Sequence, residues 1–77
     1  MKAVKLPTAN DLYRLVGHVV ECRTFNGLLF KTGSLICDDI ESDRYRIPDP
    51  DGRGYFSFAF TDVASIDGTT INFKPFV

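Results

Sequence analysis

Phenylalanine at every second position of residues 55–60 (YFSFAF) constrains the fold of this chain more than any other feature. Phe56, Phe58 and Phe60 fall on one face of an extended segment, and this two-residue period is typical of a strand with one buried face. Proteins that stack bases on such rings combine them with Lys and Arg, and this segment contains neither. We therefore expect the three rings to form a hydrophobic core rather than a platform for bases.

Turn signals divide the rest of the chain into further strands. Asn26-Gly27 and Asp67-Gly68 are hairpin signals, residues 48–54 (PDPDGRG) are typical of a loop, and Gly33 indicates a bend within a long strand. Residues 62–66 are predicted to form a tight turn of helical character. The predicted strands are residues 18–25, 28–40, 44–47, 55–60 and 70–73.

A short helix is predicted over residues 8–16, after an extended lead-in over residues 1–6. Thr8 is a favourable N-cap, Asp11 completes an acidic variant of the capping box, and Gly17 can supply the C-terminal stop. A helix of this length is not stable alone, so it must pack on the strands.

The predicted fold is a single, mainly β domain over residues 1–77, with a short N-terminal helix followed by a five-stranded, strongly bent small barrel over residues 18–74. A length of 77 residues allows one domain. Closing the strands into a barrel removes exposed sheet edges, and the helix can then cover one open end.

Catalytic and metal-binding motifs are missing from the sequence. One His and two Cys offer no ligand spacing for zinc, and residues 49–52 (DPDG) lack the glutamate that closes a calcium loop. There is no phosphate-binding loop and no nucleophile motif. His18 and Cys22 share one face of a strand, where we expect a buried or helix-packed structural histidine rather than an acid–base dyad. We expect no enzyme and no cofactor.

The compartment is predicted to be cytoplasmic. The N-terminal residues do not form a signal-peptide pattern, and no apolar run approaches the roughly 18 residues that span a bilayer. Cys22 and Cys37 are too few for the disulfide framework of a small secreted domain. Free thiols are expected, and a single bridge remains an alternative if neighbouring strands bring the two together.

The balanced total charge, with 9 Lys and Arg against 10 Asp and Glu, argues against a domain built mainly to neutralise nucleic-acid phosphates. It conceals a local excess, because six of the ten acidic residues lie within residues 38–51. Such a stretch is either a surface that steers a basic partner or a solvated loop neutralised by nearby arginines. The candidate partner-binding residues are Asp38, Asp39, Glu41 and Asp43 for electrostatics, with Tyr45 and Tyr55 as anchors and Phe25, Phe30 and Phe76 as further exposed candidates.

Three stretches carry a resemblance to known proteins: Phe25-Asn26-Gly27, residues 43–47 (DRYRI) and residues 58–66 (FAFTDVASI). With the order of the predicted elements, they resemble the Sm-like small barrels and, more narrowly, the Rho-binding antiterminator family of small bacterial inhibitors of a transcription terminator. The resemblance covers about residues 8–73. It implies an Sm-like barrel and a role in regulating a larger protein.

The leading functional hypothesis is a non-enzymatic regulatory module that inhibits or modulates a larger nucleic-acid-handling protein, or its complex with nucleic acid, through the acidic and aromatic surface. A phage or mobile-element counter-defence protein, of the anti-CRISPR kind, fits the same description. The alternative is an Sm-like oligomer that binds RNA, and a third class is a small-ligand-binding or enzymatic oligomer with a site at a symmetry axis. We expect no membrane partner, and a homo-oligomer remains open.

Overall fold

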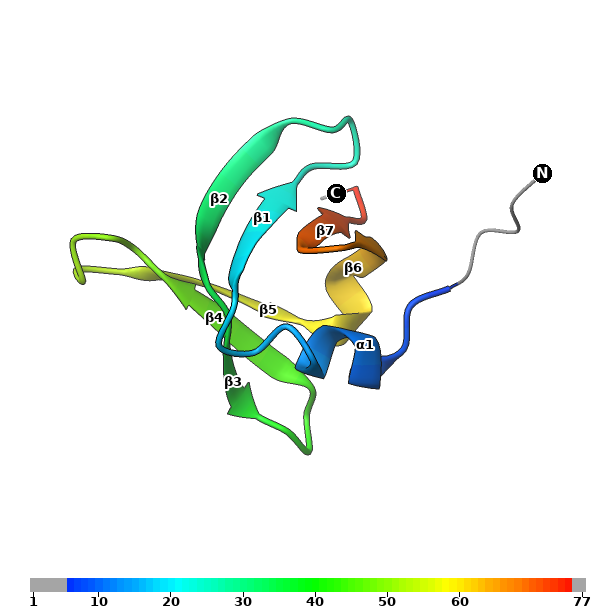
Figure 1. Ribbon diagram of the computed structural model, residues 1–77, viewed down its shortest axis with the longest axis horizontal. Coiled ribbons are helices and arrows are strands. Elements are labelled where there is room, and N and C mark those ends of the chain that lie inside the picture. The colour runs from blue at the N-terminus through cyan, green and yellow to red at the C-terminus, as the bar shows by residue number, and fades with distance from the viewer. Residues whose placement is uncertain (1–5, 76–77) are drawn as a thin grey trace.

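The computed structural model describes residues 6–75, and within them the chain is mainly β with one short helix, as predicted (Figure 1). Most of the expected lead-in, and Phe76, lie outside the described residues. The helix α1 spans Ala9–Tyr13, and a 3-10 turn, η1, spans Phe60–Asp62. The strands are β1 (Val19–Arg23), β2 (Leu29–Ser34), β3 (Ile36–Asp39), β4 (Arg44–Pro48), β5 (Tyr55–Ala59), β6 (Val63–Asp67) and β7 (Thr70–Phe73).

The strands form two sheets, with the orders β2-β1-β7-β6 and β3-β4-β5, and over residues 6–75 neither sheet closes into a barrel. The prediction of five strands is wrong, because the described part of the chain contains seven. In the first sheet, β1 pairs antiparallel with β2 and parallel with β7, so the first and last strands lie side by side. In the second, β3, β4 and β5 form an antiparallel meander whose β4–β5 hairpin projects from the rest of the molecule (Figure 1).

The first additional strand arises because the predicted segment 28–40 divides into β2 and β3. The chain passes from one sheet to the other at Leu35, which is buried and bridges to Val16. Gly33 lies just before this crossing, where a Cβ atom would be 2.8 Å from Cγ2 of Ile47 and 3.3 Å from the carbonyl oxygen of Pro48. The bend was therefore predicted in the right region. The role of Gly33 itself is different, because its lack of a Cβ atom allows β2 and β4 to approach closely.

The second additional strand is β6, where a helical turn was expected. The helical geometry is confined to η1, and β6 then pairs with β7 across a turn at Gly68, whose φ is 61°. The register shifts between Val63 and Ser65, and an irregularity of this kind disrupts the two-residue burial period by which a strand is recognised.

The helix begins as predicted but ends early. Thr8 Oγ1 accepts from the Asp11 N–H at 3.2 Å, and the Thr8 N–H donates to the Asp11 carboxylate at 3.0 Å, which completes the capping box. Beyond Tyr13 the backbone hydrogen bonds tighten to three-residue spacing, with Leu15 N–H donating to the Leu12 carbonyl. The expected range 8–16 therefore contains a five-residue helix followed by tight turns.

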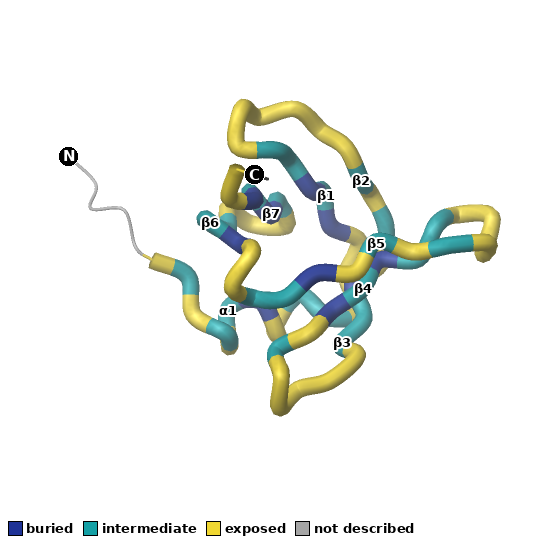
Figure 2. The backbone as a smooth tube through the Cα atoms, turned by 180° about the vertical axis from the view of Figure 1, so that it is seen from behind, coloured by how far each residue is buried: buried dark blue, intermediate teal, exposed yellow. Residues whose placement is uncertain are grey.

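The core lies between the two sheets and α1, where Figure 2 shows buried backbone positions on strands of both sheets. Phe58 is 2% exposed and stacks on Tyr45, while Phe56 and Phe60 are half-buried against the same cluster. The prediction that these rings form the core is therefore confirmed for Phe58 and only in part for Phe56 and for Phe60, which lies in η1 rather than in the strand. The buried core side chains among the described residues are those of Leu12, Val20, Cys22, Leu35, Tyr45, Ile47, Phe58, Val63, Ile71 and Phe73.

Candidate functional site

The structure does not bring the four predicted acidic residues to one place. Asp38 is near the end of β3, where its Oδ1 lies 3.1 Å from Nε of Arg46 in an ion pair. The Arg46 guanidinium in turn lies 5.6 Å from the ring centroid of Tyr55, which is 60% exposed as expected for an anchor. Asp38 and Tyr55 therefore belong to a contact chain through Arg46 across the β3-β4-β5 sheet.

The other three acids lie in and beside the turn that joins β3 to β4. Asp39 stabilises this turn, because its carboxylate accepts from the Ser42 hydroxyl at 2.7 Å and from the Glu41 N–H at 3.0 Å. These two hydrogen bonds, of which the one from the Ser42 hydroxyl has the larger effect, hold the pKa of Asp39 below its usual value. Glu41 is exposed. The side chain of Asp39 thus has a structural task, whereas Glu41 is open to a partner.

Asp43 closes the turn with an unusual backbone. Its φ of 51° is in the left-handed region, which Asp and Asn tolerate better than most residues. The peptide is held in place because the Asp43 N–H donates to Ile40 and its carbonyl accepts from Phe60 at 2.9 Å. This geometry places Asp43 at the edge of a hollow that is also lined by residues of α1.

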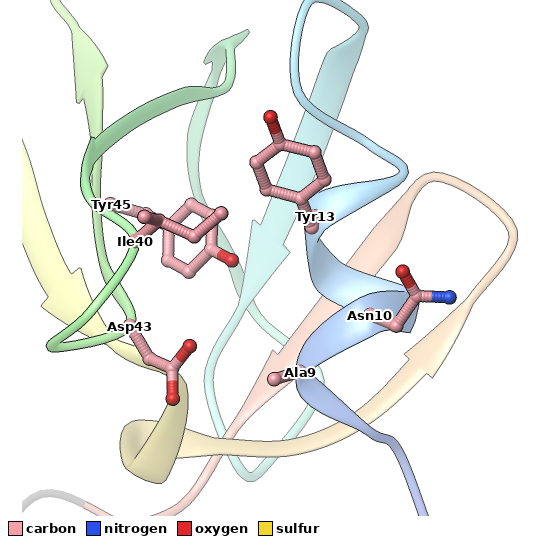
Figure 3. Close-up of a pocket in the computed structure, with 6 residues that line it drawn as sticks. All are labelled: Ala9, Asn10, Tyr13, Ile40, Asp43 and Tyr45. Carbon is pink, nitrogen blue, oxygen red and sulfur yellow. The ribbon is translucent and has the colours of Figure 1, made fainter.

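A hollow of about 360 Å³ separates α1 from the β3–β4 turn. In Figure 3, Tyr13 of α1 and Ile40 of the turn lie on opposite sides of the hollow, and the hydroxyl of Tyr45 points into the space between them. Tyr13 is 45% exposed and Ile40 61%, so both walls are open to solvent. The lining residues are Ala9, Asn10, Tyr13, Ile40, Asp43 and Tyr45.

Tyr45 was predicted to be a surface anchor, and this is wrong. Its side chain is 1% exposed and its ring stacks on Phe58, because β4 directs Tyr45 and Ile47 into the core. Its hydroxyl nevertheless reaches the floor of the hollow (Figure 3). Burial, and then the neighbouring Cys37 and Asp43, raise the pKa of Tyr45, so the hydroxyl is neutral at pH 7.

Two polar groups in the hollow are left without protein partners. Among the described residues, the Tyr45 hydroxyl makes no hydrogen bond, and the Asp43 carboxylate makes neither a hydrogen bond nor an ion pair. Both groups line the hollow, so a ligand that covers them removes them from water and gains by pairing with them. The hollow is therefore suited to a ligand that supplies hydrogen-bond donors and positive charge.

Sequence reasoning missed the apolar half of this site. Tyr13 lies beside the core residue Leu12, and Ile40 is a large apolar residue within an acidic run. Only the second feature is a usable signal, because an aliphatic side chain surrounded by acids has no neighbours in sequence that would bury it.

The expectation of a buried His18 is also wrong, because this residue is exposed. It lies one residue before β1, where its N–H donates to Leu15 and its carbonyl accepts from Leu35. Cys22 is fully buried, and this burial raises its pKa to about 12, which leaves a protonated, unreactive thiol. Cys22 and Cys37 are both free, in agreement with the prediction.

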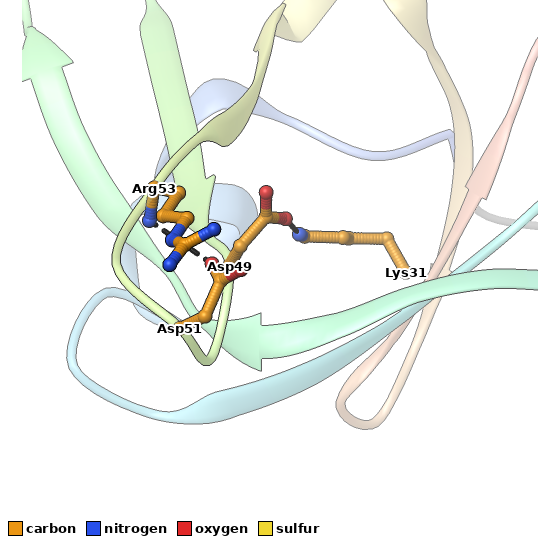
Figure 4. A network of polar contacts seen from close by, with 4 residues as sticks. All are labelled: Lys31, Asp49, Asp51 and Arg53. Atoms are coloured by element: carbon orange, nitrogen blue, oxygen red, sulfur yellow. Dashed lines mark hydrogen bonds and ion pairs between the residues drawn. The ribbon is translucent and has the colours of Figure 1, made fainter.

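The calcium-like stretch after β4 is occupied by internal contacts. Asp49 forms an ion pair with Lys31 of β2, and Asp51 accepts from the Arg53 N–H at 3.0 Å (Figure 4). The Lys31 side chain is only 14% exposed, so the pair joins β2 to the β4–β5 loop at a partly buried position. Asp49 therefore has a structural role.

A separate apolar surface follows the β1–β2 hairpin. Phe25 and Leu28 are each about two-thirds exposed, whereas Phe30, another predicted anchor, is 39% exposed. The Phe30 ring makes edge contacts with Phe56 and Phe73, with centroids 5.2 and 5.5 Å apart, so it partly belongs to the core. Gly27, with φ of 86°, forms the turn as predicted.

Comparison with known proteins found no family model, no curated protein and no solved structure that matches the chain. Across residues 6–75, no helix has the length and apolar character needed to cross a membrane.

Proposed function

We propose that this protein is a non-enzymatic binding module that recognises a basic segment of a larger protein. The observation that carries the proposal is the hollow beside the β3–β4 turn, where the unpaired carboxylate of Asp43 stands next to the exposed side chains of Tyr13 and Ile40. Apolar contact area beside an uncompensated negative charge is suited to a cationic segment that also has hydrophobic or aliphatic parts.

The kind of partner follows from the chemistry of that surface. Nucleic-acid-handling proteins carry basic surfaces that contact phosphates, and an acidic module that covers such a surface competes with the nucleic acid. We therefore propose inhibition or modulation of such a protein, including in a counter-defence role. The resemblance to the Rho-binding antiterminator family supports the same kind of activity.

We also propose that the fold is an opened variant of the Sm-like small barrel. The passage of the chain from one sheet to the other between β2 and β3, the meander that follows and the return of β7 to β1 support this relation. Strand β6, which pairs with β7, and the division into two open sheets are the departures from the predicted arrangement.

The test of the binding proposal is a change of charge at the turn with its backbone preserved. Glu41→Lys combined with Asp43→Asn raises the net charge of the protein by three. Asn tolerates the left-handed φ at position 43, so the turn is preserved. Binding of a fluorescent oligolysine peptide at low salt should weaken at least fivefold, because each lost attraction at a partly exposed site is worth about 0.5–1 kcal/mol. Anisotropy measures the affinity.

The matched control makes the same charge change elsewhere. Asp51 and Asp67 are exposed and lie in the β4–β5 loop and at the β6–β7 turn, so Asp51→Asn with Asp67→Lys should weaken oligolysine binding by twofold at most. Equal weakening in the two double variants would show that only the net charge matters, and the binding surface would then be wrongly placed.

A second candidate function is supported by the opposite charge on the β4–β5 surface. Arg44 and Arg46 alternate with the buried residues of β4, and exposed Tyr55 lies against the Arg46 guanidinium. Arginines beside an exposed ring are the elements of a single-strand-binding surface, and this favours the RNA-binding alternative. RNA binding that is lost in Tyr55→Ala and Arg46→Ala, and that weakens with salt, would replace the leading proposal.

A further inference from the structure

The hollow between α1 and the β3–β4 turn has a defined distribution of chemistry. Its floor carries the hydroxyl of Tyr45, a residue 99% buried, and its edge carries the carboxylate of Asp43. The Tyr13 ring forms one wall and the aliphatic side chain of Ile40 the other (Figure 3). An occupant therefore meets one neutral hydroxyl, one negative charge, one aromatic ring and one aliphatic surface.

These groups specify the occupant more narrowly than the acidic turn alone. The Tyr45 side chain is 1% exposed, and its hydroxyl makes no hydrogen bond among residues 6–75, so an occupant that covers it gains by donating to it. The carboxylate can only accept at neutral pH, and it favours a cationic donor. The ring can stack on a planar cation.

The geometry points to an arginine side chain of the partner protein as the ligand of this hollow. This inference rests on the proposed function and names the group that the site recognises. The guanidinium carries five N–H donors in one plane, so a single group can donate to Asp43 and to Tyr45 while its face lies on Tyr13. Its methylene groups then lie against Ile40.

Other ligand classes leave part of the hollow unmatched. A lysine ammonium is a compact, strongly hydrated charge that does not stack as a plane, and an anion is repelled by Asp43. An apolar side chain would cover Asp43 and the Tyr45 hydroxyl without giving either a hydrogen bond. Arginine is the side chain whose charge, shape and donor number match all four groups.

The test uses a short peptide in which one arginine is flanked by Gly and Ser, with citrulline and lysine versions as controls. Citrulline keeps the shape of arginine but removes its charge. Titration into the isotope-labelled protein is followed by amide chemical shifts. The arginine peptide should bind in the millimolar range, with shifts confined to residues 9–13 and 40–45, and the lysine and citrulline peptides should bind at least fivefold more weakly.

Two variants then probe the polar groups separately. Asp43→Asn should weaken binding of the arginine peptide by about tenfold, the usual effect of losing one charge-assisted hydrogen bond. Tyr45→Phe keeps the ring in the core and removes only the hydroxyl, so binding should weaken about threefold to tenfold while thermal stability is unchanged or increased. Asp67→Asn, a loss of one exposed negative charge at the β6–β7 turn and outside the lining, should change binding by less than twofold.

The outcomes separate this inference from the proposed function. If the arginine peptide leaves the signals of residues 9–13 and 40–45 unmoved at millimolar concentration, the hollow does not bind arginine. Citrulline binding as strong as arginine binding, or an unchanged affinity in both Asp43→Asn and Tyr45→Phe, would equally overturn the inference. Oligolysine binding that still depends on Glu41 and Asp43 would then leave the proposed function standing. If the parent protein binds neither the arginine peptide nor oligolysine, both the inference and the proposed function are overturned.

Discussion

Gly33→Ala is expected to destabilise the protein, although alanine is usually the better residue in a strand. Without a steric conflict, replacing glycine with alanine stabilises by about 0.4–1 kcal/mol, because the unfolded chain loses freedom. The new Cβ atom would lie 2.8 Å from Cγ2 of Ile47, whereas carbon atoms prefer separations of about 3.5–4.0 Å. It would also lie 3.3 Å from the Pro48 carbonyl oxygen, which is backbone and cannot rotate away.

The cost of this overlap follows from where it occurs. Ile47 is fully buried, so its side chain has no solvent into which it can move, and β2 must shift away from β4 instead. Overpacking of this kind costs about 1–3 kcal/mol. After subtraction of the gain from the unfolded state, a net loss of about 1–2 kcal/mol is expected, equivalent to roughly 5–15 °C in Tm for a domain of this size.

Urea unfolding followed by far-UV circular dichroism measures the loss. The decisive comparison is a double-mutant cycle with Ile47→Leu, since leucine has no methyl group at the Cγ2 position and conserves volume. Gly33→Ala should be nearly neutral in that background, with a coupling energy of about 1–2 kcal/mol. Gly52→Ala is the control, because a Cβ there meets no atom within 4 Å and its cost comes only from a φ of 73°. If Gly33→Ala is neutral or stabilising in the parent protein, the close approach of the two sheets is not what requires glycine.

Two further properties can be checked on the same samples. Asp49→Asn should lower the free energy of unfolding by about 1–2 kcal/mol, because it leaves the largely buried ammonium of Lys31 without its counter-charge. Lys31→Met should lower it less, since the side chain of Asp49 is 42% exposed. Equal urea midpoints for both variants and the parent protein would contradict this. Cys22 should resist alkylation at pH 8 in the folded protein while Cys37 reacts, and both should react in urea, which mass spectrometry of the modified peptides can establish. Because folding raises the pKa of Cys22 from 9.0 to about 12, its contribution to stability is fully present below pH 9 and is lost as the pH rises from 9 towards 12; Cys22→Ala should reduce that part of the pH dependence.

The candidate site was only partly predictable because its parts lie far apart in sequence. The acidic run included Asp43, which lines the proposed site. The same run of acids treated Asp38 and Asp39 as equivalent to Asp43. In the structure, Asp38 pairs with Arg46 and Asp39 stabilises its own turn. Charge counting cannot separate these roles, because they depend on which side chains lie within hydrogen-bonding distance in the folded chain.

Local patterns alone determined the mainly β character, the capped start of the helix, the glycine turns and the aromatic core around Phe58. Each of these depends on interactions between residues close in sequence, or on a burial period that a single strand displays. Tertiary structure decided the remainder: the division of the long strand at Leu35, the parallel pairing of β1 with β7 and the meeting of Tyr13 with Ile40 and Asp43 around the Tyr45 hydroxyl. The physical reason is that these contacts join segments brought together only when the sheets pack, and no periodicity within one segment encodes its neighbour across the core.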